Sequence, residues 1–198
     1  LNAPTFTGAY ADRKPATIDN LALHAWLERG QQGYNLVLDS LAMSLGDTRW
    51  ETRAQVQQFK GTDTAQERWH LQADHVNLTP ITPLLDALAP WPEGVAKVVD
   101  QLKATGTLRN VLADFRPHVS GDQKLSFAAN LQQVGFNATH GAPAARNVSG
   151  LISGDLGKGE LRLDSKDFML HLDPIFAKPW QYQQANALLT WALSKDTF

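Results

Sequence analysis

Apolar and polar residues alternate with period two along most of this chain, and no other feature constrains its fold as strongly. The alternating stretches are separated by glycine-containing segments such as "ERGQQG" at residues 28–33 and "GDLGKGE" at residues 154–160. Successive side chains of a β-strand point to opposite faces, so such stretches form strands with one apolar face, joined by turns. The sequence therefore predicts a mainly β protein built on an antiparallel sheet.

The alternation changes phase inside several of these strands. In "GELRLDSKDFMLHLD", residues 159–173, apolar residues occupy odd positions up to Leu163 and even positions from Phe168 onwards, with Asp164 and Ser165 between them. The same change occurs at Asp39–Ser40, at Asp74–His75 and between Leu131 and Val134. A β-bulge bends a strand and shifts its phase in this way. A tight turn at each Asp-Ser pair is the alternative, but the flanking pieces are short for separate hairpin arms, so we expect bends and a curved sheet.

Two of the phase changes lie in similar surroundings. Residues 20–47 and 147–173 both read as strand, glycine-bounded turn, strand, Asp-Ser and strand. Two copies make a weak repeat, and chance similarity between hairpins is the competing explanation. Neighbouring side chains of a strand point to opposite faces, so Asp164 is poorly placed to act as a base for Ser165. The pattern favours a structural role for the Asp-Ser pairs over a catalytic one.

One segment, residues 79–106, has apolar residues at helical spacing and is interrupted by "PWP" at residues 90–92. We expect two short helices here, with Pro83 and Pro92 in their first turns, packed at one end or face of the sheet. The chain then divides into a first β segment (1–79), a helical segment (80–104) and a second β segment (105–198). We expect the three to form one continuous structural unit of a much longer protein.

Composition limits the possible functions. The 18 basic and 20 acidic side chains give a formal net charge of −2, without the basic patch of a nucleic-acid-binding protein. The absence of cysteine excludes disulfides and thiolate metal sites. The histidines lack zinc-site spacing and the acidic residues do not match a calcium-binding loop. We expect no catalytic residues, no cofactor and no metal. The sequence also lacks about 18 consecutive apolar residues that could span a bilayer, so we expect membrane contact through regions outside it.

Several segments in a fixed order resemble a known family. They are the Leu-x-x-x-Gly-x-Leu pattern at Leu102, Gly106 and Leu108, then "RNVSGLISGD", "GELRLDS" and an aromatic-Pro segment leading to "LLTW". This order resembles the central region of the YhdP branch of AsmA-like envelope proteins, and the match is best over residues 100–193. No single motif among these is diagnostic.

The resemblance implies a periplasmic part of a protein anchored in the inner membrane. Relatives form long β-sheets around an apolar groove, help to move phospholipid to the outer membrane, affect envelope permeability and have no known catalytic residues. Flanking repeats of the same protein and phospholipid acyl chains are therefore the expected partners. We expect the following residues to line the groove, with ordinary core packing as the alternative for each: Leu36, Leu38, Phe127, Leu161, Leu163, Phe168 and Leu170.

A second class of function competes with lipid binding. Exposed aromatic side chains could serve a carbohydrate- or protein-binding β module of the envelope. Trp26 and Trp50 break the apolar phase or fall near turns, so they are the first candidates for such a surface.

Overall fold

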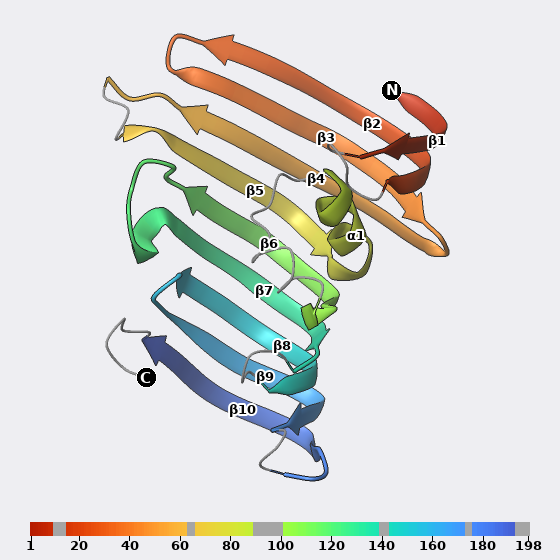
Figure 1. The fold of residues 1–198 in the computed structure, drawn as a ribbon, viewed down its shortest axis with the longest axis vertical. Coiled ribbons are helices and arrows are strands. Elements are labelled where there is room, and N and C mark those ends of the chain that lie inside the picture. The colour runs from red at the N-terminus through yellow and green to blue at the C-terminus, as the bar shows by residue number, and fades with distance from the viewer. Residues whose placement is uncertain (10–14, 63–65, 89–100, 139–142, 173–175, 193–198) are drawn as a thin grey trace.

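A computed structural model describes residues 1–9, 15–62, 66–88, 101–138, 143–172 and 176–192. These residues form one antiparallel sheet whose strand order follows the sequence from β1 to β10 (Figure 1). The elements are β1 Asn2–Gly8, β2 Ala16–Gly30, β3 Gly33–Leu45, β4 Thr48–Phe59, β5 Arg68–Asn77, α1 Leu78–Leu88, β6 Thr105–Phe115, the 3-10 turn η2 Asp122–Lys124, β7 Leu125–Phe136, β8 Ala144–Asp155, β9 Lys158–His171 and β10 Trp180–Ala192. The expected mainly β, antiparallel architecture is confirmed.

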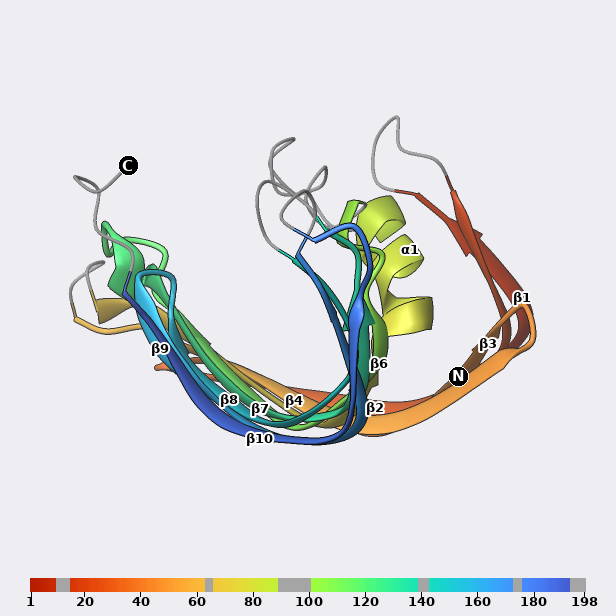
Figure 2. The same ribbon diagram turned by 90° about the horizontal axis from the view of Figure 1, so that it is seen from below.

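The sheet is curved into a trough that is open on one side (Figure 2). Both β3 and β9 continue through their Asp-Ser pairs. The register of β3 with β4 shifts between Leu38 and Leu41, and the register of β9 with β8 shifts between Leu163 and Met169. The chain therefore bends at these points and does not form hairpin turns. Five non-glycine residues inside strands adopt the left-handed backbone conformation, which Asn and Asp tolerate best after glycine. They are Asn20, Asn110, Gln133, Asn147 and Asp167.

Side-chain hydroxyls take over where bends interrupt the backbone hydrogen bonds. The Ser165 hydroxyl donates to the carbonyl of Ser149 (3.1 Å) and accepts from the amide of the same residue (2.8 Å). The hydroxyl of Ser149 in turn accepts from the amide of Gln133 (3.0 Å). Ser165 is completely buried. Since buried backbone groups need partners, Ser165 holds β8 and β9 together at the bend.

The sheet forks between β4 and β5. The two strands pair only from Ala54–Ala73 to Phe59–Arg68, and beyond Ala54 the Thr52 hydroxyl bonds the carbonyl of His75 instead. Helix α1 follows β5 directly and lies on the inner face of the sheet, between β6 and β1 (Figure 2). A core cluster joins this helix to the first strands through Ile18, Met43, Trp50 and Leu84. The helix therefore covers the inner face beside the fork.

A second core cluster packs the inner side of the bend in β7, β8 and β9. Its buried members are Leu131, Val134, Ala145, Val148, Leu163 and Phe168. Val76 of β5 packs against the cluster that contains Trp50. Its paired residue on β6, Leu108, packs against the cluster in β7, β8 and β9. The two clusters thus adjoin on one face of the sheet.

Two expectations need correction. In the part of the chain that the structure describes, α1 and a 3-10 turn are complete elements and residues 101–102 are also helical, so the two short helices are not confirmed. The second expected helix falls largely on residues 89–100, outside the described residues, and α1 begins at Leu78, five residues before Pro83. Trp50 is 6% exposed, because it packs against Leu84 of α1, and was wrongly expected at the surface.

Candidate apolar groove

The inner face of the trough can be followed residue by residue from Trp50, which contacts α1. Side chains alternate along β4, so Thr52, Ala54 and Val56 share the face of Trp50. Residues paired across a sheet also share a face, which extends the assignment from β4 to every other strand. The inner face is therefore defined by the strand registers.

Two rows of paired positions cross this face at right angles to the strands, and together we call them the apolar floor. The first row runs from β2 to β10 through Ala25, Leu38, Ala54, Ala73, Val111, Ala129, Ile152, Leu161 and Leu189. Its step from Val111 to Ala129 follows by alternation from the pair Ala113–Phe127, because the register between β6 and β7 shifts between Arg109 and Leu112. The second row runs through Leu27, Leu36, Val56, Leu71, Ala113, Phe127, Gly154, Gly159 and Trp191. Every position is apolar or glycine, so an uninterrupted apolar band spans nine strands.

The apolar floor is open over much of its length. Leu27 is 64% exposed and Leu189 is 52% exposed, and Leu36, Leu38, Phe127, Ile152 and Leu161 are only half-buried. A contiguous exposed apolar surface on a folded protein marks a binding or interaction site more often than chance. The floor is therefore the candidate functional site.

The indole of Trp191 covers the β8–β9 end of the second row. A Cβ built on Gly159 would lie 2.1 Å from Cζ2 of this ring, and one on Gly154 would lie 3.1 Å from the same atom. Glycine at these two positions therefore leaves the space in which the indole lies against the sheet. Trp191 thus provides apolar surface where its neighbours have no side chain.

All seven residues expected to line a groove lie on the inner face. Leu36, Leu38, Phe127 and Leu161 belong to the apolar floor. The remaining three lie at or beyond the bend, where Leu163 and Phe168 are buried and Leu170 is half-buried beside them. The structure thus brings these residues to one surface, and their contact with a ligand stays a prediction.

The sequence reasoning missed several members of the floor. They are Val56, Leu71, Ala73, Val111, Ile152, Leu189 and Trp191. The period of two carried the signal in each case, because these residues have the phase of the candidates in neighbouring strands. Their pairing partners could be assigned only once the strand registers were known.

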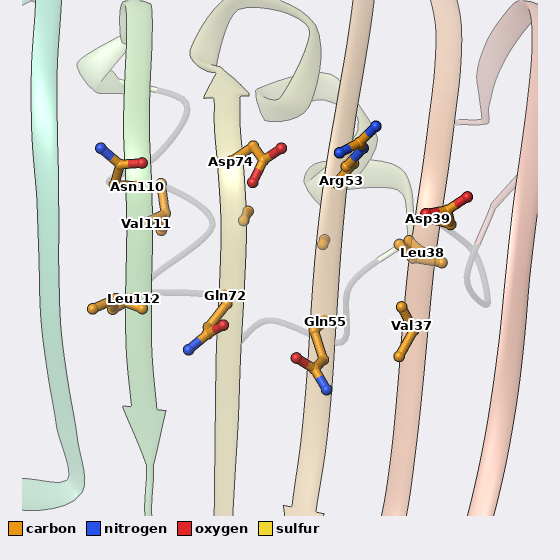
Figure 3. Close-up of a pocket in the computed structure, with 12 residues that line it drawn as sticks. Val37, Leu38, Asp39, Arg53, Gln55, Gln72, Asp74, Asn110, Val111 and Leu112 are labelled. Atoms are coloured by element: carbon orange, nitrogen blue, oxygen red, sulfur yellow. The ribbon is translucent and has the colours of Figure 1, made fainter.

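The outer face carries most of the polar side chains. On β9, Glu160, Arg162 and Asp164 alternate with the inner Leu161 and Leu163. A shallow outer cavity of about 370 Å³ is lined by residues of β3 to β6, and Figure 3 shows Arg53 between Asp39 and Asp74. Within the described residues, none of these three forms an ion pair within 4 Å with another of them, and no three His, Asp or Glu side chains group as metal ligands do.

A polar rim, which we call the turn rim, borders the floor at the end of the sheet that holds the β2–β3, β4–β5, β6–β7 and β8–β9 turns. Here the Glu67 carboxylate accepts hydrogen bonds from the side-chain amide of Gln58 (2.7 Å) and from the indole of Trp69 (3.2 Å). Its other oxygen lies 3.0 Å from the His118 ring. The bond from Gln58, followed by that with His118, holds the pKa of the Glu67 carboxyl below its usual value. Glu67 is therefore an ionised anchor of the rim at neutral pH.

The comparisons with known proteins identify the family of this chain. The model of the family described as YhdP protein matches residues 6–197. The chain belongs to the YhdP family. Neither the curated proteins nor the solved structures gave a match.

Membership of the YhdP family indicates an envelope protein with a role related to lipid transport, and the family is not a known enzyme family. The resemblance found in the sequence is thereby confirmed, and the match covers almost the whole chain. None of the helices described is long and apolar enough to cross a membrane.

Proposed function

We propose that this YhdP segment binds phospholipid acyl chains on its apolar floor and forms part of a non-enzymatic path for lipid towards the outer membrane. The observation that carries the proposal is the open, uninterrupted apolar band across nine strands. A periplasmic position, with the membrane anchor in another part of the protein, belongs to the same proposal.

Simple energetics support acyl chains as the ligand. Burying a methylene contributes about 0.8 kcal/mol, and a chain lying on a surface buries roughly half of each, so ten methylenes contribute on the order of 4 kcal/mol. This attraction needs no specific polar partner and no fixed position along the floor. A chain can therefore be held and still move from strand to strand.

The floor also suggests how the segment joins the rest of its protein. β10 is an edge strand, pairs with β9 over its whole length and carries no charged residue from Trp180 to Ala192. Edge strands that avoid association usually carry charges or proline. We include in the proposal that flanking strands of the same protein continue the sheet here and lengthen the floor beyond Leu189 and Trp191.

The aromatic alternative has less support. Trp50 is buried, while Trp26 is 43% exposed on the outer face, where it meets the ring of His24 edge-on at 5.8 Å. A sugar-binding platform normally presents several aromatic rings on one surface. The inner face offers a larger and more continuous apolar surface than this pair.

Two neighbouring leucines of β10 provide a matched test. Leu189 faces the trough and Leu188 faces outwards, and they are 52% and 61% exposed. We expect Leu189→Asp in the full-length protein to reduce crosslinking to a phosphatidylethanolamine with a photoreactive acyl chain several-fold, and Leu188→Asp to leave it unchanged. Equal crosslinking in both variants would contradict a lipid path on the inner face.

A further inference from the structure

The end of the sheet that holds the β2–β3, β4–β5 and β6–β7 turns has a distinct chemistry on β2 to β6. On these five strands, the next inner-face positions beyond the floor are polar or aromatic and form a paired row, which continues to Leu125 on β7. This row consists of Arg29, Tyr34, Gln58, Trp69 and Phe115. Along each of these strands the surface therefore passes from apolar to aromatic or polar within two residues, which is the order of groups along an amphiphile.

Cationic side chains gather on the aromatic rings of this rim. The guanidinium of Arg29 and the ammonium of Lys60 lie 5.6 and 5.3 Å from the centre of the Tyr34 ring. The Lys124 ammonium lies 5.6 Å from the Phe115 ring. On the outer side of the same end of the sheet, the Arg68 guanidinium lies 4.6 Å from the ring of its paired residue Phe59. All cation–π pairs found in the described part of the chain lie at this one end of the sheet.

A cavity of about 400 Å³ at the same end of the sheet brings two of these basic residues together with a third, Arg116. Lys60, Arg68 and Arg116 line it, along with the carboxylate-bearing Glu67. Within the described residues, the one carboxylate within 4 Å of the three cations is that of Asp114, at 3.9 Å from the half-exposed Arg68. Such an exposed pair is weak. Glu67 keeps its negative charge and is held by hydrogen bonds from Gln58 and Trp69, so three cations face one carboxylate in this cavity and the balance is positive.

At the opposite end of the sheet, Arg146 donates to the carbonyls of Phe136 (2.6 Å) and Ala145 (2.9 Å) and to the side-chain oxygen of Asn137 (2.8 Å). Its donors are therefore used to hold the end of β7 and β8.

Building on the proposed function, we propose that the cavity lined by Lys60, Arg68 and Arg116 binds the phosphate group of a phospholipid whose acyl chains lie on the apolar floor. Arginine forms paired hydrogen bonds to phosphate oxygens, and lysine contributes a compact charge. Trp69 and Tyr34 lie between cavity and floor, where amphipathic aromatic side chains suit the boundary between head group and chain. The head group is then held at the turn rim with its chains directed towards the bend.

Three probes separate the parts of this proposal. Full-length protein is titrated with a short-chain phosphatidic acid, with the diacylglycerol of the same chain length, and with inorganic phosphate. We expect wild-type protein to bind the phosphatidic acid about tenfold more tightly than the diacylglycerol, because each charged hydrogen bond to phosphate adds affinity. Inorganic phosphate alone should bind far more weakly than the phosphatidic acid.

The decisive variant is the double substitution Lys60→Gln with Arg116→Gln, and its control is Arg49→Gln with Arg162→Gln, which removes two exposed charges outside the rim. The first should abolish the tenfold preference and leave diacylglycerol binding unchanged, and the control should alter neither. A preference that survives the first variant, or wild-type protein that binds both lipids equally, overturns the rim site alone. Failure of wild-type protein to bind either lipid overturns the proposed function as well. Inorganic phosphate binding as tightly as phosphatidic acid would make the cavity a free-phosphate site and overturn the lipid assignment.

Discussion

The hydroxyl of Thr52 donates a 2.7 Å hydrogen bond to the carbonyl of His75 at the point where β4 and β5 stop sharing backbone hydrogen bonds. The indole of Trp50 lies 3.4 Å from the same carbonyl oxygen. Thr52 is buried, so this contact gives the carbonyl a hydrogen-bond partner at the point where the strands separate. Two side chains of β4 thus replace some of the backbone hydrogen bonds that β4 and β5 lack beyond Ala54. They connect the first four strands to the remaining six.

Removal of the Thr52 hydroxyl should therefore weaken the fork. Thr52→Val keeps the shape of the side chain but leaves the His75 carbonyl short of its best donor, which costs about 1–3 kcal/mol for a buried group. Thr52→Ser keeps the hydroxyl and should retain most of the stability. Urea unfolding of the two variants measures the difference. Equal losses in both would show that the methyl group matters and the hydrogen bond does not.

Ser165 makes the same kind of connection between β8 and β9. Ser165→Ala removes a donor and an acceptor that serve Ser149, and we expect a loss of about 2 kcal/mol in the free energy of unfolding. Asp164, next to it, is exposed on the outer face, so Asp164→Ala should change stability by less than about 0.5 kcal/mol. Thermal unfolding of both variants tests this contrast. A larger effect at Asp164 than at Ser165 would contradict the bend geometry.

The period of two predicted the inner face well for a physical reason. Each bend exchanges the faces of a strand, and the sequence records the exchange because the apolar residues change phase with it. Leu161 and Phe168, on opposite sides of the Asp-Ser bend, therefore fall on the same inner face despite their opposite parity. For the same reason, Leu38 and Leu41 lie on the same inner face of β3, on opposite sides of its Asp-Ser bend.

The fork and the burial of Trp50 could not be predicted in this way. Alternation along β4 continues unbroken from Trp50 to Gln58, so its sequence gives no sign that pairing with β5 ends at Ala54. Pairing is a property of two strands, and the separation becomes visible only when α1 is placed beside them. The exposure of Trp50 was misjudged because its cover comes from Leu84, a residue 34 positions later on that helix.

The carboxyl group of Glu67 should make the stability of the turn rim depend on pH. Its hydrogen bonds to Gln58 and His118 lower its pKa in the folded protein below that of the unfolded chain. Its contribution is then fully present above the ordinary glutamate pKa of about 4.3 and is lost as the pH falls through the folded-state pKa. Glu67→Gln should therefore unfold at lower urea concentration than wild type at pH 7 and approach wild type at pH 3. Glu51→Gln, at an exposed site on the outer face, controls for the loss of one carboxylate.

That pH comparison also bears on the rim as a binding surface. If Glu67 holds Gln58 and Trp69 in place, its substitution should raise local hydrogen exchange at the β4–β5 turn while leaving β8 and β9 unchanged. A gap between Glu67→Gln and wild type that stays constant from pH 7 to pH 3 would show that the carboxyl charge has no part in the effect.

Gly159 and Trp191 should be energetically coupled, because the indole occupies the space where a Cβ of residue 159 would lie. Gly159→Ala forces the ring away from the floor, and overpacking of this kind costs about 1–3 kcal/mol. In a Trp191→Ala background the clash with the ring is gone and only the contact with the Ser153 carbonyl oxygen (2.6 Å) remains, so the same glycine substitution should cost less. The double-mutant cycle in urea unfolding should give a coupling of at least about 1 kcal/mol. Additive effects would mean that the indole does not lie against the sheet, and the second row of the floor would then lack its apolar cover at β8 and β9.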